Sequence, residues 1–100
     1  MCIFMSEKEI ISEIIHRAEK SNIKKVILFG SRATGKAYRT SDFDLAVIPD
    51  SVNSLFNYKD SLEEIPTLLM FDVINLQSDM ISLDLRDSIE KEGVVLYEEV

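Results

Sequence analysis

Two aspartates, Asp42 and Asp44, stand two residues apart at the start of the apolar segment 43–48. In an extended strand this spacing directs both carboxylates to the same face. Like charges this close repel each other, and a divalent cation that prefers oxygen ligands, Mg²⁺ or Mn²⁺, would relieve the repulsion. The pair therefore predicts a metal site, although each aspartate alone is also compatible with ordinary turn or surface chemistry.

A third carboxylate, Asp72, lies inside the otherwise apolar segment 68–76. A charge there is costly unless it is paired or metal-bound. Hydrogen bonding to local backbone without a metal is the simpler alternative. If this segment lies beside 43–48, three carboxylates converge at one edge of a sheet. They can then hold two metal ions for an in-line phosphoryl transfer.

Upstream of these aspartates, Gly30 and Ser31 directly follow an apolar, β-branched segment. A tight turn there would present backbone N–H groups and the Ser31 hydroxyl to the phosphates of a nucleotide. The spacing from Gly30 to Gly35 and Lys36 also fits a P-loop. Against a P-loop, Ala37 replaces the hydroxyl residue that binds Mg²⁺, the next strand begins too soon for a full helix, and the chain is short. The Gly-Ser turn is the favoured interpretation.

The segments around these residues predict alternating helices and strands. Ser6 and Glu9 form a capping-box pattern before a helix that ends near residues 21–22. Apolar stripes predict later helices within 55–65 and 81–89. Buried strands are predicted at 24–29 and 43–48, a strand central in a covered sheet at 68–76, and a short closing strand at 94–100.

This order predicts an α/β (α+β) fold in which helices flank a small sheet of about four strands. Alternation of helices and strands favours parallel pairing, but the link between the first two strands is short, so we expect a mixed sheet. The 100 residues, 1–100, are expected to form one domain.

Composition limits the classes of partner. A net charge of −7 and a pI near 4.6 argue against a protein that binds long nucleic acid through its phosphates. Three cations nevertheless cluster near the Gly-Ser turn, which suits a small phosphorylated ligand: Arg32, Lys36 and Arg39. No apolar run approaches the roughly 20 residues that cross a membrane. With one cysteine, Cys2, and no export signal, we expect a cytoplasmic protein.

The segment GSRATGKAYRTSDFDLAV carries the pattern G-S-x(10)-D-x-D. With it the chain resembles the DNA-polymerase-β-like nucleotidyltransferases, and is most similar to the minimal nucleotidyltransferases, the MNT antitoxins of HEPN/MNT toxin–antitoxin pairs. The resemblance implies a nucleotidyltransferase fold. It also implies that the nucleotide is bound by Gly30, Ser31 and Arg32. By the same resemblance, two Mg²⁺ ions are bound, and the reaction is catalysed, by Asp42, Asp44 and Asp72.

The resemblance further implies Mg²⁺-dependent transfer of AMP from ATP to a hydroxyl, on a tyrosine, of a partner HEPN-type toxin that is thereby silenced. The alternative is a catalytically idle antitoxin that neutralises its partner by binding alone. A third option, transfer to a small molecule such as an antibiotic, usually requires a larger substrate domain. We expect the helical domain that follows the third strand in larger relatives to be missing, and therefore expect a partner surface and a hetero- or homo-oligomer.

Overall fold

The first helix, α1 (Glu7–Lys20), begins where the capping box predicts. The Ser6 hydroxyl accepts a hydrogen bond from the Glu9 N–H at 3.1 Å, and the Glu9 carboxylate accepts one from the Ser6 N–H at 3.1 Å. These two bonds satisfy backbone donors that the helix itself leaves free. The apolar face of α1 is buried through Ile10, Ile14 and Ala18.

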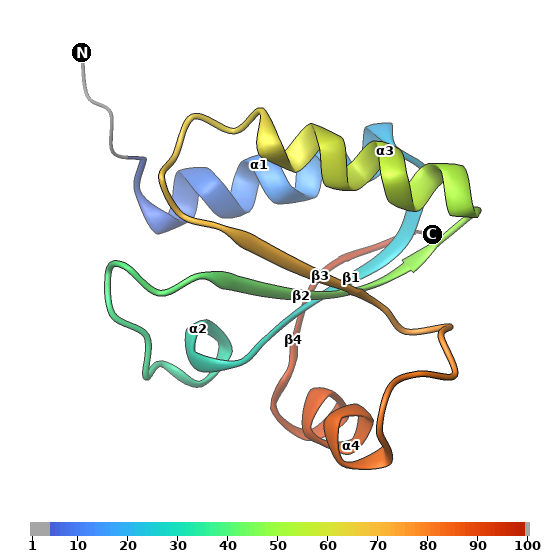
Figure 1. Cartoon of the computed structure of the whole chain (residues 1–100). Coiled ribbons are helices and arrows are strands. Elements are labelled where there is room, and N and C mark those ends of the chain that lie inside the picture. The colour runs from blue at the N-terminus through green and yellow to red at the C-terminus, as the bar shows by residue number, and fades with distance from the viewer. Residues whose placement is uncertain (1–4, 100) are drawn as a thin grey trace.

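Four strands form one mixed sheet in the order β3-β2-β1-β4 (Figure 1). Their bounds are β1 (Ile23–Phe29), β2 (Phe43–Pro49), β3 (Phe71–Asn75) and β4 (Val94–Glu98). Strand β1 is antiparallel to both β2 and β4, and β2 is parallel to β3. The mixed sheet expected from the short β1–β2 link is therefore confirmed.

The computed structural model describes residues 5–99, so Cys2 lies outside the described part. Within it, β3 is an edge strand, and the prediction that this strand is central in the sheet is wrong. The apolar run that suggested a central strand begins before β3. Leu68 and Met70 belong to the preceding loop, where they are 82% and 67% exposed.

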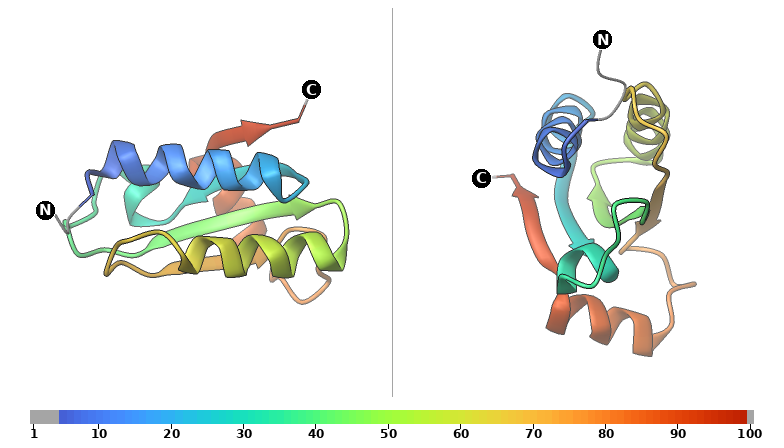
Figure 2. Two further views of the ribbon diagram at one scale, coloured as in Figure 1. Left: turned by 90° about the horizontal axis from the view of Figure 1, so that it is seen from above. Right: turned by 90° about the vertical axis from the view of Figure 1, so that its left-hand side faces the viewer.

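Helices α1 and α3 (Val52–Glu63) lie side by side on one face of the sheet (Figures 1 and 2). Tyr58 of α3 is fully buried, and its hydroxyl donates to the Ile14 carbonyl at 3.0 Å, which joins the two helices. The core between these helices and the sheet includes alternate residues of β2, all at 0% exposure: Phe43, Leu45 and Val47. No helix within residues 5–99 has the length and apolar character that crossing a membrane would require.

The opposite face of the sheet carries the short α2 (Ser31–Thr34) and α4 (Leu83–Glu92) (Figure 2). It is less completely covered than the face under α1 and α3, since Val95 of β4 remains 50% exposed. Alternation along β2 directs Asp44 and Ala46 to this second face. The second face is therefore where the predicted carboxylate site must lie.

Candidate functional site

The two strands β2 and β3 each contain the dipeptide Phe-Asp, and the dipeptides pair residue for residue. Phe43 lies opposite Phe71, and Asp44 lies opposite Asp72, in the parallel register. The two rings stack at 5.7 Å between centroids on the side of the sheet covered by α1 and α3. Because neighbouring residues of a strand point to opposite faces, both carboxylates project from the other side. The pairing that brings Asp72 beside Asp44 is thus present.

The Gly-Ser turn lies against this carboxylate pair. Phe29, the last residue of β1, pairs with Asp44, so Gly30 follows immediately beside it. Gly30 has φ 76° and ψ −156°, and a Cβ there would collide with Asp44 Oδ2. Only glycine allows so close an approach in this conformation. The turn leads directly into α2 at Ser31, so two motifs separated in sequence meet at Asp44.

Asp44 lies in surroundings that disfavour its negative charge. Its pKa is raised above the ordinary value, first by burial and then by the charges of Asp72 and Asp42. Asp42 and Asp72 are themselves exposed. The charges of Asp72 and Asp42 therefore both act on Asp44 at the edge of the sheet.

Asp42 is engaged with the start of β3. Its Oδ1 accepts a hydrogen bond from the Met70 N–H at 3.2 Å, and the Phe43 N–H donates to the Met70 carbonyl at 3.0 Å. In residues 5–99, no three Asp, Glu, His or Cys side chains already stand as a metal-binding group. The assignment of Asp42, Asp44 and Asp72 as metal ligands therefore stays a prediction.

The guanidinium of Arg32 contacts groups of the chain on several sides. Its guanidinium stacks over the Phe43 ring at 4.3 Å and pairs with Glu7 at 2.7 Å. The remaining donors reach the backbone of the loop before β2, including the Ser41 carbonyl. Phe43 and Asp44 point to opposite faces, so Arg32 lies on the face away from the Asp44 carboxylate. The assignment of Arg32 to nucleotide binding therefore stays a prediction, and the contacts that Arg32 makes are with the chain itself.

The polymerase beta nucleotidyltransferase family matches residues 9–100, which is nearly the whole chain. The chain belongs to this family. Proteins with curated descriptions give no match to the sequence. The mixed sheet of this nucleotidyltransferase, with Gly-Ser at the end of β1 and Asp-x-Asp at the start of β2, is the arrangement expected from the G-S-x(10)-D-x-D pattern.

Solved structures share the fold of this nucleotidyltransferase. A toxin–antitoxin structure with AMP-PNP gives a TM-score of 0.68 at 22% identity, covering 88% of this chain and 73% of that one. A tri-AMPylated Shewanella oneidensis HEPN toxin in complex with MNT antitoxin gives 0.64 at 18% identity, covering 93% and 73%. An MntA-HepT toxin–antitoxin structure gives 0.64 at 18% identity, covering 92% and 73%. At these identities the likeness establishes the fold.

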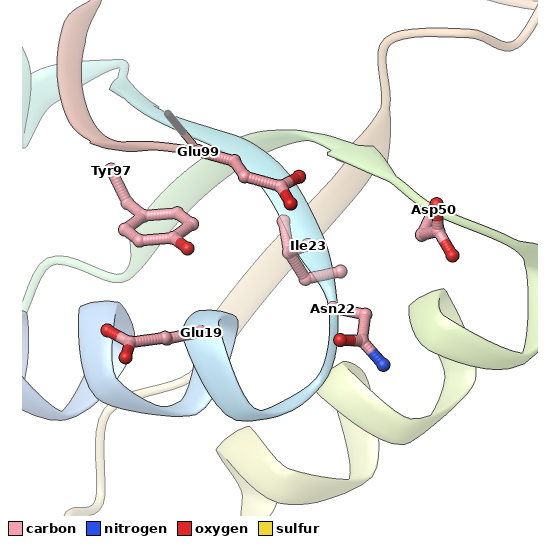
Figure 3. Close-up of a pocket in the computed structure, with 6 residues that line it drawn as sticks. All are labelled: Glu19, Asn22, Ile23, Asp50, Tyr97 and Glu99. Atoms are coloured by element: carbon pink, nitrogen blue, oxygen red, sulfur yellow. The ribbon is translucent and has the colours of Figure 1, made fainter.

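A separate pocket of about 140 Å³ lies at the far end of β1 and β2 (Figure 3). Ile23, which lines it, pairs with Pro49, whereas the carboxylate pair lies at the Phe29 end of the same two strands. Three further carboxylates line this pocket of the nucleotidyltransferase, Glu19, Asp50 and Glu99. Their charge is unsuited to a triphosphate, so the open edge at Asp44 is the better candidate.

Two features of the site were not predicted from the sequence. Glu7, the partner of Arg32, is 25 positions away in the chain, and nothing in its local pattern marks it. The repeated Phe-Asp dipeptide is a usable signal, because aligning the two copies places both rings on one face and both carboxylates on the other.

Proposed function

We propose that this nucleotidyltransferase is the antitoxin of a HEPN-type toxin and transfers AMP from ATP to a hydroxyl of that partner, on a tyrosine. One observation carries the proposal: Asp44 and Asp72 are paired on adjacent strands, directly beside the Gly30 turn. The similar solved structures support it, since one contains AMP-PNP and another a tri-AMPylated HEPN toxin with an MNT antitoxin. Because ATP is the donor, the proposal also places the reaction in the cytoplasm.

The donor set at this edge fits a hard divalent cation. Carboxylate oxygens are the ligands that Mg²⁺ and Mn²⁺ prefer. Burial, and then the charges of Asp72 and Asp42, raise the pKa of Asp44, so a bound cation would stabilise its ionised form. Asp42, Asp44 and Asp72 would hold the metal, with two ions proposed. When bound, the ions would neutralise charge on the phosphates and favour ionisation of the attacking hydroxyl.

Other residues of the chain would bind the phosphates of ATP and accept the proton of the acceptor hydroxyl. Backbone N–H groups of the Gly30-Ser31 turn and the Ser31 hydroxyl would bind the phosphates of ATP. The acceptor oxygen forms a bond to the α-phosphorus as the bond from that phosphorus to the oxygen bridging to the β-phosphorus breaks. Pyrophosphate leaves with that oxygen. The proton of the acceptor hydroxyl passes to the Asp72 carboxylate, which is exposed at the sheet edge and so accessible to a partner chain.

A second candidate is an antitoxin that neutralises its partner by binding alone. One observation favours it: Leu68 and Met70 expose apolar surface next to the site. Exposed apolar residues of this kind suit a protein partner. In this case the carboxylates would contribute nothing to neutralisation.

Incubation of the protein with labelled ATP, Mg²⁺ and the purified partner separates the two candidates. We expect label on the partner, a mass increase of one or more AMP units, and loss of both with Asp42→Ala/Asp44→Ala. Asp79→Ala is the matched control, because Asp79 is an exposed carboxylate outside the site. Equal transfer by wild type and the double variant would refute the enzyme. Neutralisation retained by a folded double variant would favour binding alone.

A further inference from the structure

The guanidinium of Arg32 donates hydrogen bonds to several backbone carbonyls of the loop that precedes β2. Arg32 Nε and Nη2 donate to the Ser41 carbonyl at 2.9 and 2.7 Å. Nη2 also donates to the Arg39 carbonyl at 3.1 Å and lies 3.4 Å from the Tyr38 carbonyl. Ser41 is the residue immediately before Asp42, so the loop is held at the peptide unit that leads into the first aspartate.

Arg32 is itself fixed from two sides. Its Nη1 donates to a carboxylate oxygen of Glu7, in the first turn of α1, at 2.7 Å. Its plane lies over the Phe43 ring at 4.3 Å from the centroid, and only 5% of the side chain is exposed. A planar, delocalised guanidinium can stack and donate in several directions at once, which the single ammonium of a lysine cannot do. The geometry therefore demands arginine at this position.

Asp42 is consequently restrained on both sides. Arg32 donates to the Ser41 carbonyl, in the peptide unit that precedes Asp42, and the Met70 N–H donates to the Asp42 carboxylate at 3.2 Å. If the loop moved, the spacing between the Asp42 and Asp44 carboxylates would change, because the two share one short segment of chain. A displacement of about 1 Å at such a site can cost a factor of about 100 in rate.

We propose that Arg32, braced by Glu7, is a positioning residue that sets the Asp42 carboxylate beside Asp44, and is not a ligand of the nucleotide phosphates. All three nitrogens of its guanidinium are engaged by the loop and by Glu7. The stacking on Phe43 keeps it on the face of β2 opposite to Asp44. This assignment rests on the proposed function, in which Asp42 takes part in AMP transfer.

Arg32→Lys tests the assignment, because it keeps the positive charge but removes the planar set of donors. With ATP, Mg²⁺ and the partner, we expect kcat to fall by roughly 10- to 100-fold, as for other residues that orient metal ligands, while KM for ATP stays within about twofold. Amide hydrogen exchange of residues 38–42 should become faster. Glu7→Gln should change kcat and exchange in the same direction by a smaller factor.

Arg17→Lys is the matched control. Arg17 also joins α1 to another element through several bonds, to Glu13 and to the Ser61 carbonyl and hydroxyl, and its side chain is 19% exposed. We expect it to lower the free energy of unfolding as much as Arg32→Lys does. It should leave kcat and the exchange of residues 38–42 at wild-type values, since it does not contact that loop.

Two results would overturn the assignment. A rise of tenfold or more in KM for ATP with unchanged kcat in Arg32→Lys would identify a phosphate ligand instead. Unchanged exchange of residues 38–42 would show that Arg32 does not hold the loop. If wild type transfers no AMP, the proposed function fails, whereas the exchange comparison between wild type, Arg32→Lys and Arg17→Lys still decides whether Arg32 orders the loop.

Discussion

The contact between Gly30 and Asp44 makes a quantitative prediction about the substitution Gly30→Ala. The backbone at Gly30, φ 76° and ψ −156°, is in a region that costs other residues roughly 1–3 kcal/mol. The added methyl group also collides with Asp44 Oδ2, and overpacking typically costs about 1–3 kcal/mol. Alanine also restricts the conformations of the unfolded chain, which offsets about 0.4–1 kcal/mol of this loss of stability. The free energy of unfolding should therefore fall by roughly 1–6 kcal/mol, out of a total of about 5–15.

Urea denaturation measures that loss, and AMP transfer to the partner, corrected for the folded fraction, measures the effect on the site. Because Asp44 must move to admit the methyl group, we expect transfer to fall by about 100-fold. Gly35→Ala is the matched control: its φ is also positive, 77°, but an added Cβ meets nothing within 4 Å. It should lose only about 0.5–1 kcal/mol and transfer normally. If Gly30→Ala behaved like Gly35→Ala in both assays, the turn would not be built against Asp44.

Other variants separate stability from activity. Tyr58→Phe removes the 3.0 Å bond to the Ile14 carbonyl and should cost about 1–2 kcal/mol in urea denaturation, with transfer per folded molecule unchanged. A transfer defect would indicate that α3 shapes the site. Burial and like charges raise the pKa of Asp44 in the folded chain. Protonation of Asp44 therefore stabilises the fold fully below its unfolded pKa of about 3.9, and this stabilisation is lost as the pH rises through the higher folded pKa. Asp44→Asn should therefore unfold at higher urea than wild type at neutral pH in EDTA, yet transfer no AMP; equal midpoints would contradict the repulsion. Ser31→Ala should raise KM for ATP by roughly 5- to 10-fold, as loss of one hydrogen bond to a charged group predicts, and an unchanged KM would exclude the hydroxyl from phosphate binding.

Signals confined to neighbouring residues were sufficient to predict much of the fold. The capping box at Ser6 fixes the start of α1, and glycine at position 30 marks the end of β1. The position of β3 could not be predicted in this way. Whether a strand is central or at an edge depends on which strands pair with it, and the apolar residues Leu68 and Met70, which favoured a central strand, lie in an exposed loop.

The surroundings of Arg32 show the same limit within the candidate site. Arg32, Lys36 and Arg39 are equivalent as a cluster of positive charges in the sequence, yet only Arg32 among them is nearly buried, while Lys36 and Arg39 are exposed. The difference arises from Glu7 and Phe43, which approach Arg32 only in the folded chain. Composition and spacing predict that cations lie near the site but not which atoms they contact.

The paired Phe-Asp dipeptides also protect the chain against misfolding. If β3 slipped by one residue along β2, every side chain of β3 would change face, so Phe71 would enter solvent and Asp72 would face the core. Exposing Phe71, which is partly buried, would forfeit part of the about 1.5–3 kcal/mol that full burial of such a side chain contributes, and burying an unpaired carboxylate would cost several kcal/mol more. The two errors occur together, so misregistered chains are strongly disfavoured even though β3 has only five residues. The dipeptides that place the two carboxylates at this edge thus also fix the register of β3.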